Sequence, residues 1–344
     1  MKKLKFSLSP ETGRLSERDA KRYFTTFGIA ACALMIAYHL SGYFLSYAIY
    51  RFMPRWIGSP LLDHLFSIVT LYVIAFPCFF LVMNRLPRDT MAPTKMGGKA
   101  WLIALCIALG FMMVGNYIGN FITYYFSSML DESLQNPVES LTSGQSFWIN
   151  LVFVSIVAPI LEELVFRKFV CDRLLPLGEG YAVVLSAILF GLVHGNFFQF
   201  FYAAAVGALF AFIYVKTGRL RYSIAYHMII NFLGGVIAPW LADRIEPWLT
   251  EEGVAELLEM SSVNFTEYSH LMLTVFLPLL AYEAVFLGGG VLGLVFLIKD
   301  RKKIRFCEGL LPPPKENRLA TVFCSGGIAA AIAVFAGVFI LSLL

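Results

Sequence analysis

Ala158-Pro-Ile-Leu-Glu162-Glu163-Leu-Val-Phe-Arg167 is the stretch of sequence that decides the fold. It places two adjacent carboxylates and an arginine inside an apolar segment long enough to cross a membrane, where an ionisable group is costly and by default indicates function. A turn rich in proline and glycine follows, and then a second apolar segment. The pattern predicts an antiparallel helical hairpin over residues 149–201.

The second limb of this hairpin carries His194. If the turn centres on Gly178, Glu162 and His194 lie equally far from it along the chain, so the two limbs bring them to the same depth. A third apolar segment contains His227-Met-Ile-Ile-Asn231, whose i,i+4 spacing places both polar side chains on one helical face. The sequence thus predicts that polar groups from three helices meet inside the membrane.

The composition of the 344 residues fixes the class of protein, since 58% are hydrophobic and only 15% are charged. No soluble domain of this size needs so much apolar sequence, and we expect an integral membrane protein in contact with the lipid bilayer. The six cysteines form no C-x-x-C pair, which argues against disulfides and against a cysteine metal site. The net charge of +4 comes with no folded basic domain, so no nucleic-acid partner is expected.

Nine hydrophobic segments have about the length of a membrane helix. They predict an all-α, polytopic membrane helical bundle of about eight or nine transmembrane helices, with the active site among the central helices. The segments are residues 25–50, 62–83, 100–126, 146–170, 183–197, 198–216, 222–241, 271–298 and 319–343.

The segments group into three parts. Residues 1–145 form a cytoplasmic tail and three membrane helices, residues 146–241 a catalytic helical core, and residues 242–344 an acidic outer loop and two C-terminal membrane helices. In the outer loop Thr250 is placed to cap a short amphipathic surface helix.

The basic residues predict that the N-terminus is cytoplasmic. Of the 27 Lys and Arg residues, only Arg51, Arg55 and Arg244 fall outside the loops and the tail assigned to the cytoplasm. The tail is basic and lacks an apolar run, as expected of a cytoplasmic segment rather than a signal peptide. The orientation after Gly195 depends on whether the short break there is a true turn. We expect a multi-pass protein of a bacterial plasma membrane.

Each residue of the first motif has a separate expected role. Glu163 and Arg167 are spaced i,i+4, the geometry of an ion pair within one helix, and we expect this pair to be structural. Glu162 points about 100° away on the same helix and is free to face a polar cavity, where a carboxylate can act as a general base. The alternative for Glu162 is a carboxylate that hydrogen-bonds to a neighbouring helix.

The remaining polar residues have functional and structural readings as well. An isolated His194 would be a packing histidine, but its register with Glu162 favours a functional role. His227 and Asn231 are hydrogen-bond donors on one helical face, suited to stabilise the oxyanion that forms when water attacks an amide carbonyl. Their alternative is a hydrogen-bonded pair between helices.

Two further features lie outside these motifs. Glu283 is another acidic residue at membrane depth, and it is either a partner for Arg167 or the site, or a lone protonated packing residue. Gly115-x-x-x-Gly119 predicts a close contact between helices, because small residues let two helix backbones approach each other.

Three motifs thus follow one another on successive membrane segments: Glu162-Glu163-x-x-x-Arg167, Phe190-x-x-x-His194 and His227-x-x-x-Asn231. This order resembles the CAAX prenyl protease and bacteriocin-processing (CPBP, or Abi) family, which includes the type II CAAX prenyl endopeptidases and is grouped as intramembrane glutamic proteases. The resemblance covers roughly residues 147–240. It implies a peptidase that acts on a membrane-associated protein or peptide without a cofactor.

The resemblance also implies roles for the site residues. Glu162 and His194 would activate the water molecule, while His227 and Asn231 would form the oxyanion hole. The site would open toward the cytoplasm, because Glu162 lies only about 8 Å inward of Arg167 at 1.5 Å per helical residue. Whether the substrate is prenylated does not follow from these residues.

Two rival readings remain open at this point. The first is a zinc-dependent membrane protease, since Glu162, His194 and His227 are the residue types of a His2Glu metal site, although the sequence has no H-E-x-x-H motif. The second is a non-catalytic membrane scaffold or bacteriocin-immunity protein that keeps the polar cluster for binding. A chelator assay separates the first from the metal-independent peptidase, and a Glu162→Gln variant separates the second.

Overall fold

The computed structural model describes residues 3–131 and 134–343, and its architecture is a polytopic α-helical bundle. In the described part of the chain, seven helices are long and apolar enough to cross a membrane, and two shorter helices are apolar throughout. This confirms the predicted all-α membrane fold. The seven spans are Glu17–Phe52, Leu61–Met83, Gly98–Leu130, Phe147–Leu177, Phe197–Thr217, Leu220–Leu249 and Phe265–Lys303.

Most spans consist of several helical elements, in which η marks 3-10 or π-helical turns. The first elements are α1 (Glu17–Phe52), η1 (Pro54–Trp56), α2 (Pro60–Ser67), η2 (Ile68–Ala75), α3 (Phe76–Met83) and α4 (Gly98–Leu130). The central elements are α5 (Pro137–Thr142), α6 (Phe147–Asn150), η3 (Leu151–Val157), α7 (Ala158–Glu163), η4 (Leu164–Cys171), α8 (Asp172–Leu174), η5 (Leu175–Leu177), α9 (Glu179–Val193), α10 (Phe197–Thr217) and α11 (Leu220–Phe232). The last elements are η6 (Leu233–Ile237), α12 (Ala238–Ile245), η7 (Glu246–Leu249), α13 (Glu251–Val263), α14 (Phe265–Leu271), η8 (Met272–Phe276), α15 (Leu277–Asp300), η9 (Arg301–Lys303), α16 (Arg318–Phe323) and α17 (Gly326–Leu341).

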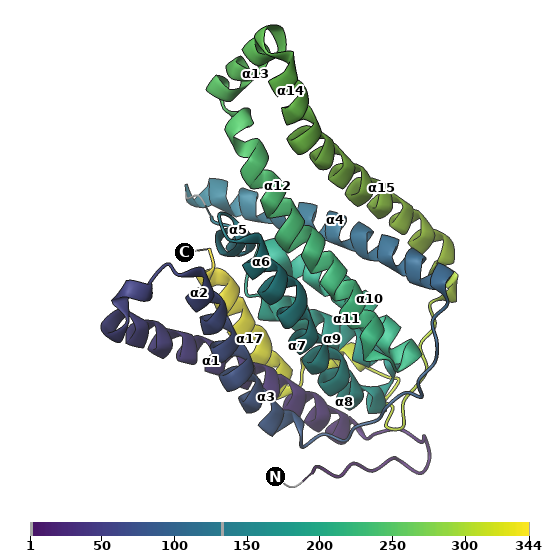
Figure 1. Ribbon diagram of the computed structural model, residues 1–344. Coiled ribbons are helices and arrows are strands. Elements are labelled where there is room, and N and C mark those ends of the chain that lie inside the picture. Colours follow the sequence, from purple (N-terminus) through teal and green to yellow (C-terminus); the bar gives the residue numbers. More distant parts are fainter. Residues whose placement is uncertain (1–2, 132–133, 344) are drawn as a thin grey trace.

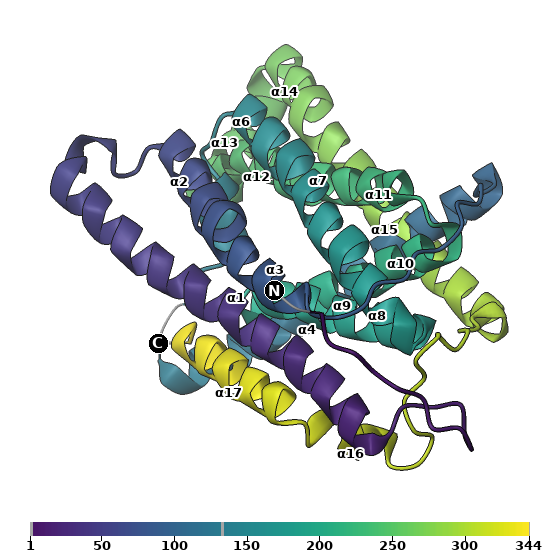
Figure 2. The same cartoon turned by 90° about the horizontal axis from the view of Figure 1, so that it is seen from below.

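The central helices lie between two outer groups. Figure 1 shows α1, α3 and α17 on one side of the helical hairpin, and α4 with α15 on the other. Seen from below in Figure 2, α17 runs beside α1. One hydrophobic core joins α1, α3, η4, α9 and α17, and a second joins α4, α10 and α11. The helices of the predicted site therefore contact both cores.

Prolines shape the long spans from inside. Wide π-helical turns end two residues before a proline in several of them: Pro77, Pro159, Pro239 and Pro278. A proline has no amide N–H and its ring collides with the carbonyl of the preceding turn, so a wider turn accommodates it. Pro159 therefore adjusts the helix less than one turn before Glu162.

The break near Gly195 is a true turn, which separates α9 from α10. Gly195 has a positive φ of 69°, and the side chain of Asn196 accepts a hydrogen bond from the amide of Gln199 at 3.0 Å, as an N-cap of α10. A Cβ added to Gly191 would lie 2.8 Å from the carbonyl oxygen of Phe200, so α9 and α10 fold back tightly on each other.

Two predicted segments differ from the structure in their limits. The segment expected at 183–197 is α9, a helix of only 15 residues that begins earlier, directly after the hairpin turn. The segment expected at 319–343 divides into α16 and the 16-residue α17. The division falls at Ser325, whose backbone is extended, ahead of the flexible pair Gly326-Gly327. Apolar composition alone does not locate either boundary.

Two smaller predictions are confirmed. A Cβ added to Gly115 would lie 2.4 Å from the Cα of Tyr202, so this face of α4 packs directly on the backbone of α10. In the acidic loop, α13 begins after Thr250, whose hydroxyl oxygen accepts a hydrogen bond from the amide of Gly253 at 3.0 Å. Figure 1 shows α13 and α14 at one end of the bundle, away from the hairpin turn.

Candidate active site

The hairpin forms as predicted, with its turn at Gly178. This glycine has a φ of 129°, a conformation that residues with a side chain rarely adopt. The turn joins the span that contains α7 and η4 to α9, and η4 packs against α9. The first two motifs are thereby placed on neighbouring antiparallel helices, and α11 brings the third motif against α7.

Glu163 and Arg167 form the predicted ion pair. The Nε of Arg167 donates to Oε2 of Glu163 at 3.0 Å, and both side chains have no exposed surface. A second guanidinium nitrogen, Nη1, donates to the hydroxyl of Ser186 on α9 at 2.9 Å, and that hydroxyl donates to the carbonyl of Phe166. The guanidinium also lies over the ring of Phe190, 5.0 Å from its centre. Arg167 thus fastens the two limbs of the hairpin together.

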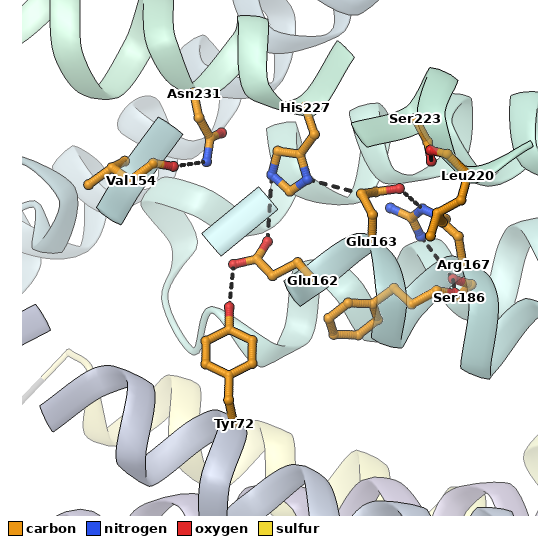
Figure 3. Close-up of polar contacts among 11 residues, drawn as sticks. Tyr72, Val154, Glu162, Glu163, Arg167, Ser186, Leu220, Ser223, His227 and Asn231 are labelled. Atoms are coloured by element: carbon orange, nitrogen blue, oxygen red, sulfur yellow. Dashed lines mark hydrogen bonds and ion pairs between the residues drawn. The ribbon is translucent and has the colours of Figure 1, made fainter. Parts of the chain in front are cut away.

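His227 lies between the two carboxylates (Figure 3). Its Nδ1 is 3.1 Å from Oε1 of Glu163, and its Nε2 is 3.5 Å from Oε2 of Glu162. Because the buried carboxylate can only accept when it is ionised, Nδ1 carries a proton in this arrangement. The imidazole is buried and packs against the rings of Phe190 and Phe210. Its position is therefore fixed by both polar and aromatic contacts.

Glu162 differs from its neighbour in its surroundings. Its side chain keeps 17% of its surface exposed, against none for Glu163. The hydroxyl of Tyr72, from the neighbouring span that includes η2, donates to Oε1 of Glu162 at 3.2 Å. Figure 3 shows the carboxylate held between Tyr72 on one side and His227 on the other. Two adjacent glutamates thus have different environments, one sealed in an ion pair and one accessible.

His194 follows α9 directly, as its helix C-cap. Its Nδ1 lies 2.8 Å from the carbonyl oxygen of Phe190, and since a carbonyl only accepts, Nδ1 carries the proton of the neutral ring. The other nitrogen, Nε2, is then a free acceptor. The charge of Glu162 acts on His194, although no direct hydrogen bond joins the two in the described part of the chain. The predicted common depth of these residues agrees with this proximity.

Asn231 lies one turn beyond His227 on α11, as its spacing predicts. Its amide nitrogen donates to the carbonyl of Val154 at 3.0 Å, and the neighbouring Ser155 donates to the carbonyl of Met228 at 3.1 Å. The carbonyl of Val154 lies in the π-helical turn η3, where a wider turn leaves backbone acceptors free for side chains. The amide group of Asn231 has two N–H donors, and the second of them does not bond to Val154.

Sequence reasoning missed two polar partners. Ser186 precedes Phe190 by one helical turn on the face of α9 that meets Arg167, and this spacing could have indicated it. Tyr72 gave no such signal, because an aromatic residue in an apolar span reads as packing. Of the two readings of Glu283, pairing with Arg167 is excluded, since Glu283 is exposed on α15 and the carboxylate beside Arg167 is that of Glu163.

A cavity lies near the first motif. It has a volume of about 450 Å³ and opens between α3 and the span that carries this motif. Tyr72, the donor to Glu162, is among its lining residues, whereas Glu162 itself is not. Most of the wall is apolar, and its charged residues are Arg88, Lys168, Asp172 and Arg173. An apolar cavity with a few polar groups is the usual form of a binding site. Within residues 3–131 and 134–343, no three His, Cys, Asp or Glu side chains are arranged to share a metal ion.

Comparison with known proteins points to one family for this region. Residues 144–233 match the model of the family described as type II CAAX prenyl endopeptidase Rce1-like. A candidate membrane peptidase of Bacillus subtilis is 28% identical over 48% of this chain and 68% of its own length. The membrane-embedded CAAX protease MroQ of Staphylococcus aureus is 25% identical over 58% of this chain and 86% of its own length.

A human protein gives a shorter match. CAAX prenyl protease 2 of Homo sapiens is 34% identical over 23% of this chain and 30% of its own length. No solved structure matches the chain. The family match covers α6 to α11, which hold all three motifs, and its limits agree with the stretch over which the motifs carried the resemblance. The region that builds the site therefore matches the family described as type II CAAX prenyl endopeptidase Rce1-like.

Proposed function

We propose that this chain is an integral membrane endopeptidase that hydrolyses a peptide bond of a membrane-associated protein or peptide. The names of the relatives support the peptidase class. The observation that carries the proposal is the contrast between the two adjacent glutamates. Glu163 is buried in the ion pair with Arg167, whereas the side chain of Glu162 is partly exposed and contacts Tyr72 and His227.

Glu162 is the general base in this proposal. A water molecule placed between Glu162 and Nε2 of His194 donates one hydrogen bond to each acceptor, which orients a lone pair of the water oxygen toward the substrate carbonyl. As the water attacks, Glu162 accepts a proton and later delivers it to the leaving amine. Tyr72 fixes the rotamer of the carboxylate through the hydrogen bond to Oε1.

His227 and Asn231 stabilise the oxyanion in this proposal. In this proposal both ring nitrogens of His227 carry a proton, because each faces a carboxylate that only accepts. Nδ1–H donates to Glu163, and Nε2–H, 3.5 Å from Glu162, can instead donate to a developing oxyanion. Asn231 contributes the N–H that Val154 leaves unused. Glu163 and Arg167 position His227 and do not take part in proton transfer. Donors that are already in place before the reaction stabilise the transition state more than donors that must first reorganise.

The test is the substitution Glu162→Gln, which removes the proton acceptor but keeps the size of the side chain and its capacity to accept from Tyr72. We expect loss of more than nine tenths of the cleavage of a membrane-anchored reporter peptide, with unchanged yield and unfolding midpoint. Glu283→Gln is the matched control, because Glu283 is an exposed membrane-span glutamate far from the site along the chain. A Glu162→Gln protein that retains more than a tenth of the activity refutes the role of Glu162.

The same experiment addresses the two rivals. A non-catalytic scaffold cleaves nothing, so a wild-type protein without activity on any membrane-anchored substrate favours that reading. The zinc reading would need Glu162, His194 and His227 to come together as ligands, and a chelator assay tests it. Proteomic comparison of cells that carry the intact protein with cells that carry Glu162→Ala identifies the substrate as a precursor that accumulates.

A further inference from the structure

A second, larger cavity lies away from the candidate active site. Its volume is about 620 Å³, within the range of about 300–1,000 Å³ that is usual for small-molecule sites. It is bounded by α1, α9, α16, α17 and the segment 304–317 that precedes α16. Figure 2 shows α17 and α16 alongside α1 at this place. Nothing in the proposed peptide hydrolysis uses this cavity.

The cavity uses the opposite face of α9 from the one that builds the active site. Its lining on this helix includes Tyr181, Leu185 and Leu192, whose spacing places them on one side. Ser186 and Phe190, which contact Arg167, lie on the other side of the same helix. The larger cavity is therefore separated from the Glu163–Arg167 ion pair by the width of α9.

Most of this cavity is walled by apolar side chains from membrane helices. The wall contains Phe27 and Ala31 from α1, Ile188 from α9, and Ile332 and Phe335 from α17. Ile188 and Ile332 are about half exposed, at 41% and 51%, so this wall is open at the side where the helices face lipid. A hydrocarbon chain fits such a wall, because it offers apolar surface and no hydrogen-bonding groups.

One end of the cavity is instead basic. Arg14 donates to both carboxylate oxygens of Glu308, at 2.5 and 2.7 Å, and to the carbonyl of Pro313 at 2.9 Å. The charges of Lys315 and Arg318 also act on Glu308, so three cations surround one carboxylate. The pKa of Glu308 lies below its usual range. The hydrogen bonds from Arg14 are the main cause, and these charges add to it. The local excess of positive charge is suited to an anion.

Two groups at this end lack partners of their own. Arg318 is exposed and lines the cavity, and it makes no hydrogen bond or ion pair within the part of the chain that the structure describes. The hydroxyl of Tyr181 also has no hydrogen-bond partner among the described residues, although both Arg14 and Arg318 act on it electrostatically. A guanidinium and a phenol that line the same cavity offer donors for a phosphate.

The basic end is held in shape by the segment before α16. The amide of Glu179 donates to the carbonyl of Cys307 at 3.0 Å, and the amide of Cys307 donates to the Glu179 carboxylate at 2.8 Å. The amide of Leu311 donates to the carbonyl of Pro176 at 2.6 Å. This segment is thereby fastened to the turn of the hairpin. The arginines, with Arg14 at 13% side-chain exposure, are therefore presented by a fixed backbone rather than by a free tail.

We propose that this cavity binds one anionic phospholipid, with an acyl chain between α1, α9 and α17 and the phosphate at Arg14, Arg318 and Tyr181. The argument is charge complementarity at one end of an otherwise apolar cavity that is open to the bilayer. Basic pockets between membrane helices are known to bind anionic lipid headgroups. A bound lipid bridges α17 to the hairpin that carries His194, and so stabilises the packing of α9.

The experiment measures lipid binding to the purified, delipidated full-length protein by native mass spectrometry. Dioleoyl phosphatidylglycerol and dioleoyl phosphatidylcholine are compared, since they share acyl chains and differ in net charge. We expect phosphatidylglycerol to bind at least tenfold more tightly, as a single molecule per chain. Equal affinity for the two lipids overturns the proposal, and so does equally tight binding of glycerol phosphate, which carries the headgroup chemistry without the chain.

Variants locate the site. Arg318→Gln should lower the preference for phosphatidylglycerol about threefold or more without affecting folding, because Arg318 has no partner to lose. Ile188→Trp, which fills the apolar part, should weaken both lipids. Arg51→Gln with Arg55→Gln is the matched control, since these exposed arginines lie at the other end of α1 and beyond it. A preference that survives Arg318→Gln but disappears in the control variant places the anion site elsewhere and refutes the assignment.

Discussion

The buried pair of Glu163 and Arg167 gives the sharpest prediction about the stability of this protein. Arg167→Ala removes the partner of a carboxylate that has no exposed surface, together with the bond to Ser186 that links the two limbs of the hairpin. Removal of one member of a buried ion pair costs about 3–5 kcal/mol, because the other charge stays in a poorly solvating environment. His227 remains 3.1 Å from Glu163 as a hydrogen-bond partner, so we expect the lower end of this range.

The double variant separates the charge from the other losses. In Arg167→Ala with Glu163→Gln, the unpaired carboxylate is replaced by a neutral amide of nearly the same shape. The penalty for burying a neutral group without a partner is about 1–3 kcal/mol, so about 1–2 kcal/mol of the loss should be recovered. The coupling energy of the complete cycle should fall within the range of about 0.5–3 kcal/mol that contacting residues show.

The measurement is the free energy of unfolding in mixed detergent, followed by circular dichroism or by protease resistance. Lys303→Ala is the control, because Lys303 forms an ion pair with Asp300 at 2.7 Å but keeps 78% of its side chain exposed. An exposed pair contributes about 0–1 kcal/mol, so this variant should unfold almost as the wild type does. An Arg167→Ala protein within 1 kcal/mol of the wild type, or a double variant no more stable than it, contradicts the structural role of the pair.

Three further predictions concern the chemistry of the site. Tyr72→Phe keeps the ring but removes the donor to Glu162. We expect kcat to fall about tenfold, which corresponds to the loss of one hydrogen bond, with little change in KM. An unchanged kcat contradicts the positioning role. Asn231→Ala should lower kcat about a hundredfold or more, as loss of one oxyanion donor does, while the affinity for substrate stays constant; a rise in KM alone indicates a binding role instead. Strong chelators should leave cleavage intact, whereas one zinc per purified chain together with loss of activity on chelation would show that His227 serves as a metal ligand.

The membrane fold followed from the sequence to a large extent. Apolar length separates membrane helices from other elements, because the bilayer core requires about 20 apolar residues per helix. Local spacing was equally informative, since i,i+4 geometry is a property of a single helix. It predicted the Glu163–Arg167 pair, and the cap at Thr250 followed from its place before an acidic first turn. The sequence did not locate the limits of α9 or the division before α17, because the apolar composition continues across both boundaries.

The contacts between helices were decided by the tertiary structure. Tyr72 lies 90 positions before Glu162 in the sequence, and only the packing of α3 and η2 beside the hairpin brings its hydroxyl to that carboxylate. The sequence placed His227 and Asn231 on one face but did not show that His227 stands between both glutamates. Which of two neighbouring carboxylates is sealed and which is accessible depends on the rotation of one helix against three others. Spacing along a helix determines which side chains share a face, and only packing determines what that face meets.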